Sequence, residues 1–135
     1  MTYPVTDIDG IGPEAADALK SVGIRTTKGL LESAKTPKLR LNLASRTGID
    51  EKKILSWANA ADRMRIRGVG ADYAELLRVA GVDTVKELKY RNPSKLADAM
   101  ASANTKRKLV RLLPSEHTVK GWIEIARKLP MLISY

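Results

Sequence analysis

Apolar residues recur every three or four positions along most of the chain, which is the spacing of amphipathic helices. The pattern is clearest at residues 51–64, where Ile54, Leu55, Trp57, Ala58, Ala61 and Met64 share one helical face. Cap and stop residues divide the chain into expected helices at about 13–22, 27–34, 37–46, 51–64, 71–80, 85–91, 93–101 and 118–129. A further amphipathic helix is expected in the basic stretch that ends at Pro114. No segment shows the alternation of a strand, so the pattern predicts an all-α fold.

Two short turns share the form glycine-apolar-glycine, Gly10-Ile11-Gly12 and Gly68-Val69-Gly70, and lie 58 residues apart. The alignment extends through Gly23 with Gly81 and, after a gap, pairs Trp57 with Trp122, both expected in the core rather than on a stacking surface. It predicts two tandem modules in one compact unit with a continuous core. Residues 1–60 form the first, incomplete at its N-terminal side, and residues 61–135 the second, which shares the 51–64 helix.

The quoted turns, with Gly-Ile-Arg-Thr at 23–26 and Gly-Val-Asp-Thr at 81–84, resemble the helix-hairpin-helix superfamily. The whole pattern looks like a bacterial family of tandem helix-hairpin-helix domains that carries no assigned function. The resemblance implies two helix-hairpin-helix modules. Many members of the superfamily bind nucleic-acid backbones without reading sequence, whereas others hold only protein partners. Hairpin carbonyls in the superfamily sometimes bind a monovalent cation, and no other cofactor is expected.

The formal net charge of +9 favours an anionic partner, although charge that serves only solubility is the alternative. Residues 1–60 hold nine Lys/Arg against seven Asp/Glu, and residues 61–135 hold fifteen against eight, so the second half is the more basic. The absence of cysteine excludes disulfides and thiolate chemistry. With no signal-peptide pattern and no membrane-length apolar run, the expected location is cytoplasmic, with no membrane contact.

The glycine turns place unpaired N–H groups at the start of a helix, where the helix dipole adds positive charge, and this combination attracts phosphate. The candidate nucleic-acid-binding residues are those of the two turns and the cations near the second: Gly10, Ile11, Gly12, Arg63, Arg65, Arg67, Gly68, Val69, Gly70, Lys106, Arg107, Lys108 and Arg111. Each turn also has a purely structural interpretation as a tight helix connection. Acidic residues follow both turns, Glu14 and Asp17 in one copy and Asp72 and Glu75 in the other, and they oppose phosphate binding.

Catalysis and metal binding find little support, because the single histidine, His117, is expected in a loop, and Asp7 and Asp9 make a poor cation site. Residues 10–15 fit a dinucleotide-binding fingerprint, but no strand precedes them, which excludes that interpretation. The sequence therefore favours a non-catalytic protein that binds the DNA or RNA backbone independently of sequence. The alternative is an adaptor for protein partners or self-assembly that uses the apolar tail Met131–Tyr135 and the acidic helix starts.

Overall fold

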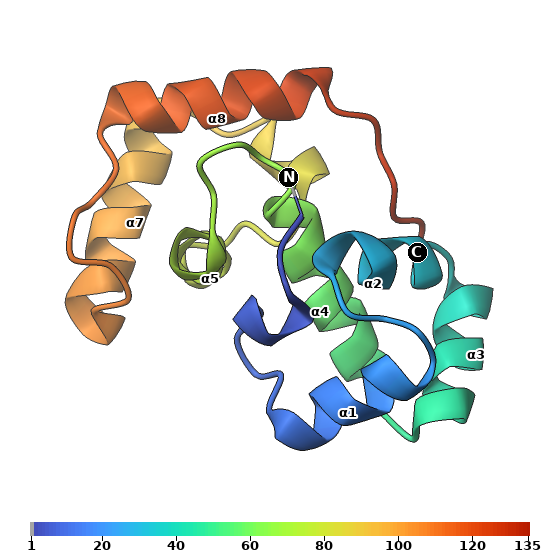
Figure 1. Ribbon diagram of the computed structural model, residues 1–135. Helices are drawn as coiled ribbons and strands as arrows, with labels where there is room; N and C mark the ends of the chain where they lie inside the picture. Colours follow the sequence, from blue (N-terminus) through green and yellow to red (C-terminus); the bar gives the residue numbers. More distant parts are fainter. Residues whose placement is uncertain (1) are drawn as a thin grey trace.

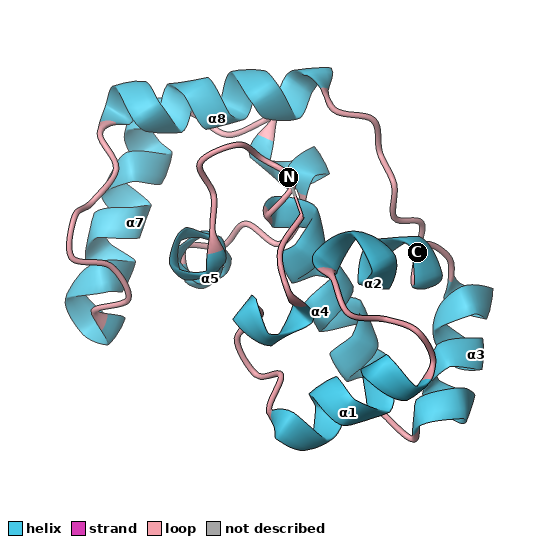
Figure 2. Ribbon diagram, viewed as in Figure 1, coloured by secondary structure: helices cyan, strands magenta, loops and turns pink. Residues whose placement is uncertain are grey.

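The computed structural model describes residues 2–135, and this part of the chain is all-helical, as predicted (Figures 1 and 2). A short 3-10 helix, η1, spans Val5–Asp7, and one isolated bridge pairs Pro4 with Thr26. The α-helices are α1 (Pro13–Ser21), α2 (Thr27–Ser33), α3 (Pro37–Thr47), α4 (Glu51–Arg63), α5 (Ala71–Val79), α6 (Val85–Leu88), α7 (Pro93–Arg107) and α8 (Glu116–Lys128).

The largest departure from the predicted helices lies at residues 102–115. Helix α7 continues to Arg107, and Ala103 extends the buried face of Leu96 and Met100 beyond residue 101. Residues 108–115 then form a loop instead of the predicted helix, since Lys108 takes a left-handed conformation (φ 46°) that ends α7. Helix α8 begins at Glu116 instead of the predicted residue 118. The sequence predicts a cap at Thr118, but Ser115 is the cap, and it accepts a hydrogen bond from the Thr118 N–H.

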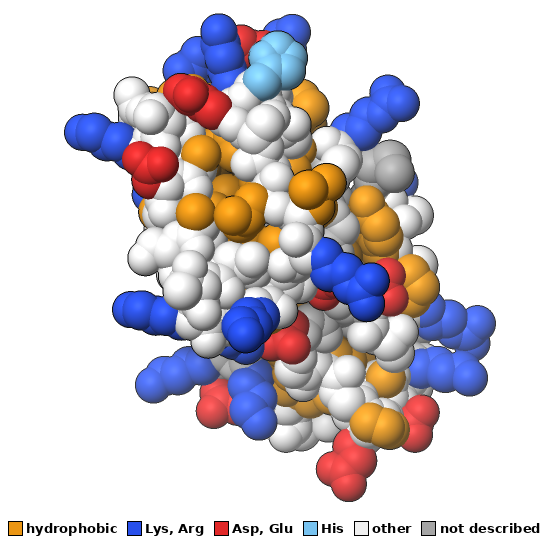
Figure 3. All heavy atoms as spheres, turned by 90° about the vertical axis from the view of Figure 1, so that its left-hand side faces the viewer, with side chains coloured by type: hydrophobic (Ala, Val, Ile, Leu, Met, Phe, Trp, Pro, Cys, Tyr) orange, Lys and Arg blue, Asp and Glu red, His pale blue; other side chains and the backbone are white. Residues whose placement is uncertain are grey.

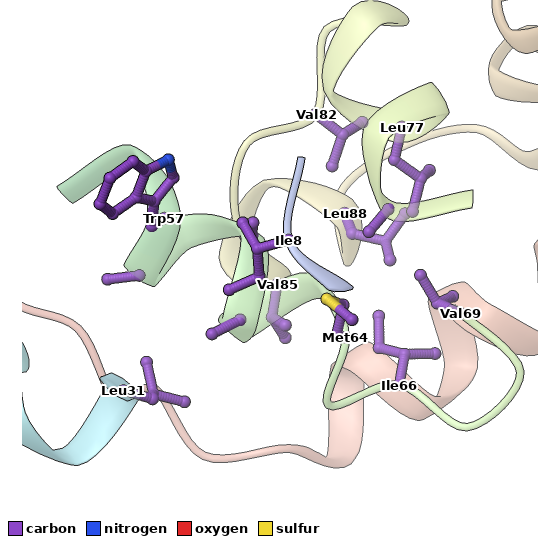
Figure 4. Packing of buried hydrophobic residues seen from close by; sticks show 14 of the residues in the cluster. Ile8, Leu31, Trp57, Met64, Ile66, Val69, Leu77, Val82, Val85 and Leu88 are labelled. Atoms are coloured by element: carbon purple, nitrogen blue, oxygen red, sulfur yellow. The ribbon is translucent and has the colours of Figure 1, made fainter. Parts of the chain in front are cut away.

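Helix α4 lies at the centre of the molecule and packs against α2, α3 and α5 (Figure 1). One cluster of buried apolar side chains extends from Val5 in η1 to Ala126 in α8, so the core is continuous across both halves of the chain. Figure 4 shows part of this cluster, with Met64, Ile66, Val69 and Leu77 near one another. Burial from both halves supplies most of the free energy that holds the helices together.

Both tryptophans lie in the core, as expected, with Trp57 8% and Trp122 4% exposed. Each indole lies under a glycine turn. A β-carbon added at Gly10 would lie 3.3 Å from the Trp57 Nε1, and one added at Gly68 would lie 3.3 Å from the Trp122 Nε1. Both glycines also have the same positive φ of 93°. The same local geometry therefore recurs at the two positions that the sequence alignment pairs, whereas the division into two modules stays a prediction.

The C-terminal tail, residues 129–135, packs back on the first half of the chain. The Ser134 N–H donates to the Lys35 carbonyl at 2.8 Å, and the Arg40 Nη2 donates to the Ser134 carbonyl at 2.8 Å. The Tyr135 hydroxyl lies 2.8 Å from the Asn59 Oδ1, to which it donates. These contacts fix the tail on the body.

Candidate nucleic-acid interface

The second glycine turn is closed by its own backbone. The Val69 N–H donates to the Ile66 carbonyl at 3.0 Å, and the Val69 side chain is buried in the core. Ile11 repeats the arrangement in the first turn, donating to the Ile8 carbonyl at 3.2 Å. The expectation that the Val69 and Ile11 amides face a ligand is therefore wrong, because a turn with glycine at its third position uses the fourth N–H internally.

Free donors remain at the start of α5. Within residues 2–135 the N–H groups of Gly68 and Gly70, and those of Ala71, Asp72 and Tyr73 at the start of α5, have no hydrogen-bond acceptor, whereas the Ala74 N–H donates to the Gly70 carbonyl. Gly70 is the N-cap of α5 and contributes no side-chain cap. The positive end of the helix dipole is therefore open at this point.

Arg63 lies inside the protein, contrary to its expected place beside the turn. It is 1% exposed, its Nε donates to the Ala74 carbonyl at 2.9 Å, and its Nη1 donates to the Asp83 carbonyl at 2.7 Å. Burial lowers the pKa of Arg63 to about 10, against the opposing effect of Asp83 and other nearby carboxylates. Its role is to attach the end of α4 to α5 and to the turn that follows α5.

Arg65 is also engaged within the protein. Its Nη1 donates to Asp62 at 2.6 Å, and its Nη2 donates to the Pro130 carbonyl at 2.7 Å, so it links α4 to the C-terminal tail. Asp62 in turn accepts from the Val85 N–H at 2.9 Å, at the start of α6. Of the three arginines before the turn, only Arg67 is exposed.

Arg107, although exposed, forms an ion pair with Glu75. Its Nη1 lies 3.2 Å from the Glu75 carboxylate, which also accepts from the Arg78 Nε at 2.8 Å. The hydrogen bond that Arg78 donates to the Glu75 carboxylate raises the pKa of Arg78. Glu75 was expected to repel a phosphate, but two arginines, Arg78 and Arg107, compensate its charge.

The loop 108–112 packs against the first turn of α5, beside the open helix terminus. The Tyr73 hydroxyl donates to the Leu112 carbonyl at 2.7 Å, across 39 residues of sequence. Between loop and helix runs a groove of about 740 Å³, lined by Asp72, Tyr73, Lys108, Leu109, Val110, Arg111 and Leu112. Lys108 and Arg111 are both exposed, as is Lys106 at the end of α7. Two of the predicted cations thus line a groove at the α5 N-terminus.

Figure 3 shows the side of the molecule on which α7 and this loop lie. Hydrophobic side chains gather in the upper half of this face, and Lys and Arg side chains project around them. Leu112 is 77% exposed. Asp and Glu side chains also lie on this face, so it combines charge of both signs with apolar surface.

Two further residues organise the groove: Asn104, which the sequence did not point to, and Tyr73, which the sequence places near the second turn without indicating its contacts. Asn104 donates from its Nδ2 to the Val110 carbonyl and accepts from the Val110 N–H, both at 3.0 Å. Tyr73 packs against Trp122, with ring centroids 5.5 Å apart. An asparagine near the end of a helix is a local signal for a cap, but the partner of Tyr73 lies too far along the chain for any spacing rule.

The first glycine turn faces acidic residues instead. A pocket of about 300 Å³ beside Gly10 is lined by Asp7, Asp9, Asp72 and Glu75 among others. Three of these carboxylates have no ion pair in the described part of the chain. The field at Gly10, Ile11 and Gly12 therefore disfavours phosphate, and because Ala71, Asp72 and Glu75 line the same pocket, the acidic residues also lie beside the start of α5.

His117 is exposed in the first turn of α8, not in the expected loop. Residues 2–135 contain no group of three or more His, Cys, Asp or Glu side chains placed to hold a metal ion. Among the helices described, none has the length and apolar character needed to cross a membrane.

Comparison with known proteins identifies one family. No curated protein and no solved structure matches the chain. A family model described as "Domain of unknown function (DUF4332)" matches residues 9–129, which is most of the chain. The protein therefore belongs to the DUF4332 family.

Proposed function

We propose that the protein binds the nucleic-acid backbone independently of sequence, as a non-catalytic helix-hairpin-helix protein, through the second glycine turn and the adjoining loop. The observation that carries the proposal is the packing of loop 108–112 against the first turn of α5. It brings Lys108 and Arg111 to a helix terminus with unpaired N–H groups, and Arg67 is exposed in the turn that leads into that helix. Cations beside open helix amides are the usual contacts to a phosphate chain.

The adaptor is the second candidate, because the C-terminal tail has accessible apolar side chains: Met131 is 43% and Tyr135 is 65% exposed. Its backbone is already engaged, since residues 130, 134 and 135 are hydrogen-bonded to α2, α3, α4 or the segments beside them. No cofactor enters the proposal.

The test is fluorescence anisotropy of labelled oligonucleotides titrated with the protein at several salt concentrations. If Arg67, Lys108 and Arg111 each contact one phosphate of a single strand, log Kd should change with log salt concentration with a slope of about 2. The double substitution Lys108→Glu and Arg111→Glu should weaken binding at every salt concentration and remove most of that slope.

The matched control is Lys38→Glu with Arg46→Glu. These residues are also one exposed lysine and one exposed arginine, but they lie on α3, on the opposite side of the molecule in Figure 1. The control changes net charge equally and should retain affinity to within about twofold, since only distant charges change. Equal loss in both variants, or no binding even at low salt, would overturn the proposal.

A further inference from the structure

The groove between loop 108–112 and α5 is held in shape from both sides. Asn104 makes two hydrogen bonds with Val110, and the Tyr73 hydroxyl makes one with Leu112. Tyr73 itself packs on Trp122, a core residue. The walls of the groove are therefore fixed before any ligand arrives.

The lining of the groove is divided by chemistry. Lys108 and Arg111 supply positive charge, while Leu109, Val110 and Leu112 supply apolar surface. Asp72, exposed in the first turn of α5, has no ion-pair partner in the described part of the chain. A surface that contacted only phosphates would gain nothing from the exposed leucine and would be weakened by the carboxylate.

An unpaired nucleobase explains all three features. Its faces are apolar and its edge carries N–H donors, which a carboxylate accepts, while the phosphates that flank it need cations. A groove of about 740 Å³ lies within the roughly 300–1,000 Å³ of small-molecule sites, so a base fits. In a duplex these edges are paired and the faces are stacked, so they are not available to the groove.

We propose that this groove takes an unpaired base of single-stranded nucleic acid, with Asp72 accepting a hydrogen bond from the amino group of the base. Leu112 and Tyr73 contact the base, and Lys108 and Arg111 contact the neighbouring phosphates. The inference rests on the proposed function and refines it: backbone contacts supply most of the affinity, and the base contact adds a preference for single strands and for bases that carry an amino group.

The test compares oligo(dC) with oligo(dT) of equal length, at slightly alkaline pH and by fluorescence anisotropy. Both bases are pyrimidines, but only cytosine has an amino group. The expected preference for oligo(dC) is about fivefold, which corresponds to the low end of the discrimination that one base contact provides. Asp72→Ala should bring the ratio of the two affinities close to one. Leu112→Ser should weaken both oligonucleotides but not a duplex.

Glu14→Ala is the matched control. Glu14 is exposed in the first turn of α1, at the position that corresponds to Asp72 in α5, and its removal changes net charge equally. It should leave the oligo(dC) to oligo(dT) ratio unchanged. Circular dichroism of each variant checks that the helices remain.

Opposite results identify the competing explanations. If Asp72 only repels phosphate, Asp72→Ala tightens both oligonucleotides by the same factor and leaves their ratio unchanged, which overturns the inference. Equal affinity for duplex and single strands also overturns it. A third contrary result is occupation of the groove by another protein or by a second copy of the chain. A second copy would make the mass of the protein in solution depend on its concentration, and neither occupant would give a base preference. If the wild-type protein shows no base preference but the Lys108→Glu and Arg111→Glu variant loses binding, the proposed function holds and this inference is wrong. If the wild-type protein binds no oligonucleotide, the proposed function and this inference are both wrong.

Discussion

Replacing Lys108 with glycine should stabilise the fold while it weakens nucleic-acid binding. Lys108 is the one non-glycine residue with positive φ in the described part of the chain, at the position after α7 where glycine is the usual residue. A side chain in this conformation costs roughly 1–2 kcal/mol. Glycine removes that cost but adds about 0.5–1 kcal/mol of unfolded-state entropy. The free energy of unfolding should therefore rise by about 0.5–1 kcal/mol.

Lys106→Gly provides the control, because it also removes one exposed lysine but lies within the last turn of α7. There glycine should lower the free energy of unfolding by up to about 1 kcal/mol. Urea unfolding measures both changes, and anisotropy with a single-stranded oligonucleotide measures binding. Binding should fall more for Lys108→Gly, since Lys108 lines the groove. If Lys108→Gly destabilises the protein as much as Lys106→Gly, the interpretation of the left-handed position is refuted.

Two further predictions concern the glycine turn and the buried arginine. Gly68→Ala should lower the free energy of unfolding by about 1–2 kcal/mol, since Gly68 has φ of 93° and a β-carbon there would lie 3.3 Å from Trp122. Gly70→Ala is the control, because a β-carbon at Gly70 would have no atom within 4 Å. It should change thermal stability little. Arg63→Ala should lower the free energy of unfolding in urea by about 3 kcal/mol, because it removes two hydrogen bonds of a buried guanidinium together with its packing. Arg67 is exposed, and Arg67→Ala should change the same free energy by no more than about 0.5 kcal/mol. Equal effects of the two glycine substitutions would contradict the backbone argument, and equal effects of the two arginine substitutions would contradict the burial of Arg63.

Helix positions followed from the sequence where the signals were local. Thr36, Asp50 and Asn92 are recognisable as caps from the sequence, and of the two candidates Thr26 and Thr27 it is Thr26 that caps α2. The signal is local because the side-chain acceptor and the N–H donor are two or three residues apart. The tryptophans were placed in the core for the same kind of reason, since each lies on the apolar face of its own helix.

The candidate site depended on contacts that no local pattern reveals. Three arginines alternate along the chain at positions 63, 65 and 67, yet their surroundings differ. Arg63 is buried, Arg65 is hydrogen-bonded to Asp62 and to the tail, and Arg67 is exposed. Their partners lie as far away as Pro130. Residues 108–113 mix leucines with cations at helical spacing, but the interactions of Asn104 and Tyr73 hold them as a loop. Tertiary contacts overrode local preference here.

The two halves of the chain differ most in the segment that forms the groove. Helices α1 and α5, and likewise α2 and α6, begin 58 residues apart, and α3 and α7 begin 56 apart, but α4 and α8 begin 65 residues apart. The additional residues therefore lie in α7 and in the loop that follows it. This segment carries Lys106, Lys108 and Arg111, holds a lysine in a costly conformation and exposes Leu112. The first half has no counterpart of this segment, and the acidic pocket beside its glycine turn also includes Asp72 and Glu75 of α5. Leu109 and Val110 of the same segment pack against the core, so the segment contributes to packing as well as to the surface on which the proposed binding rests.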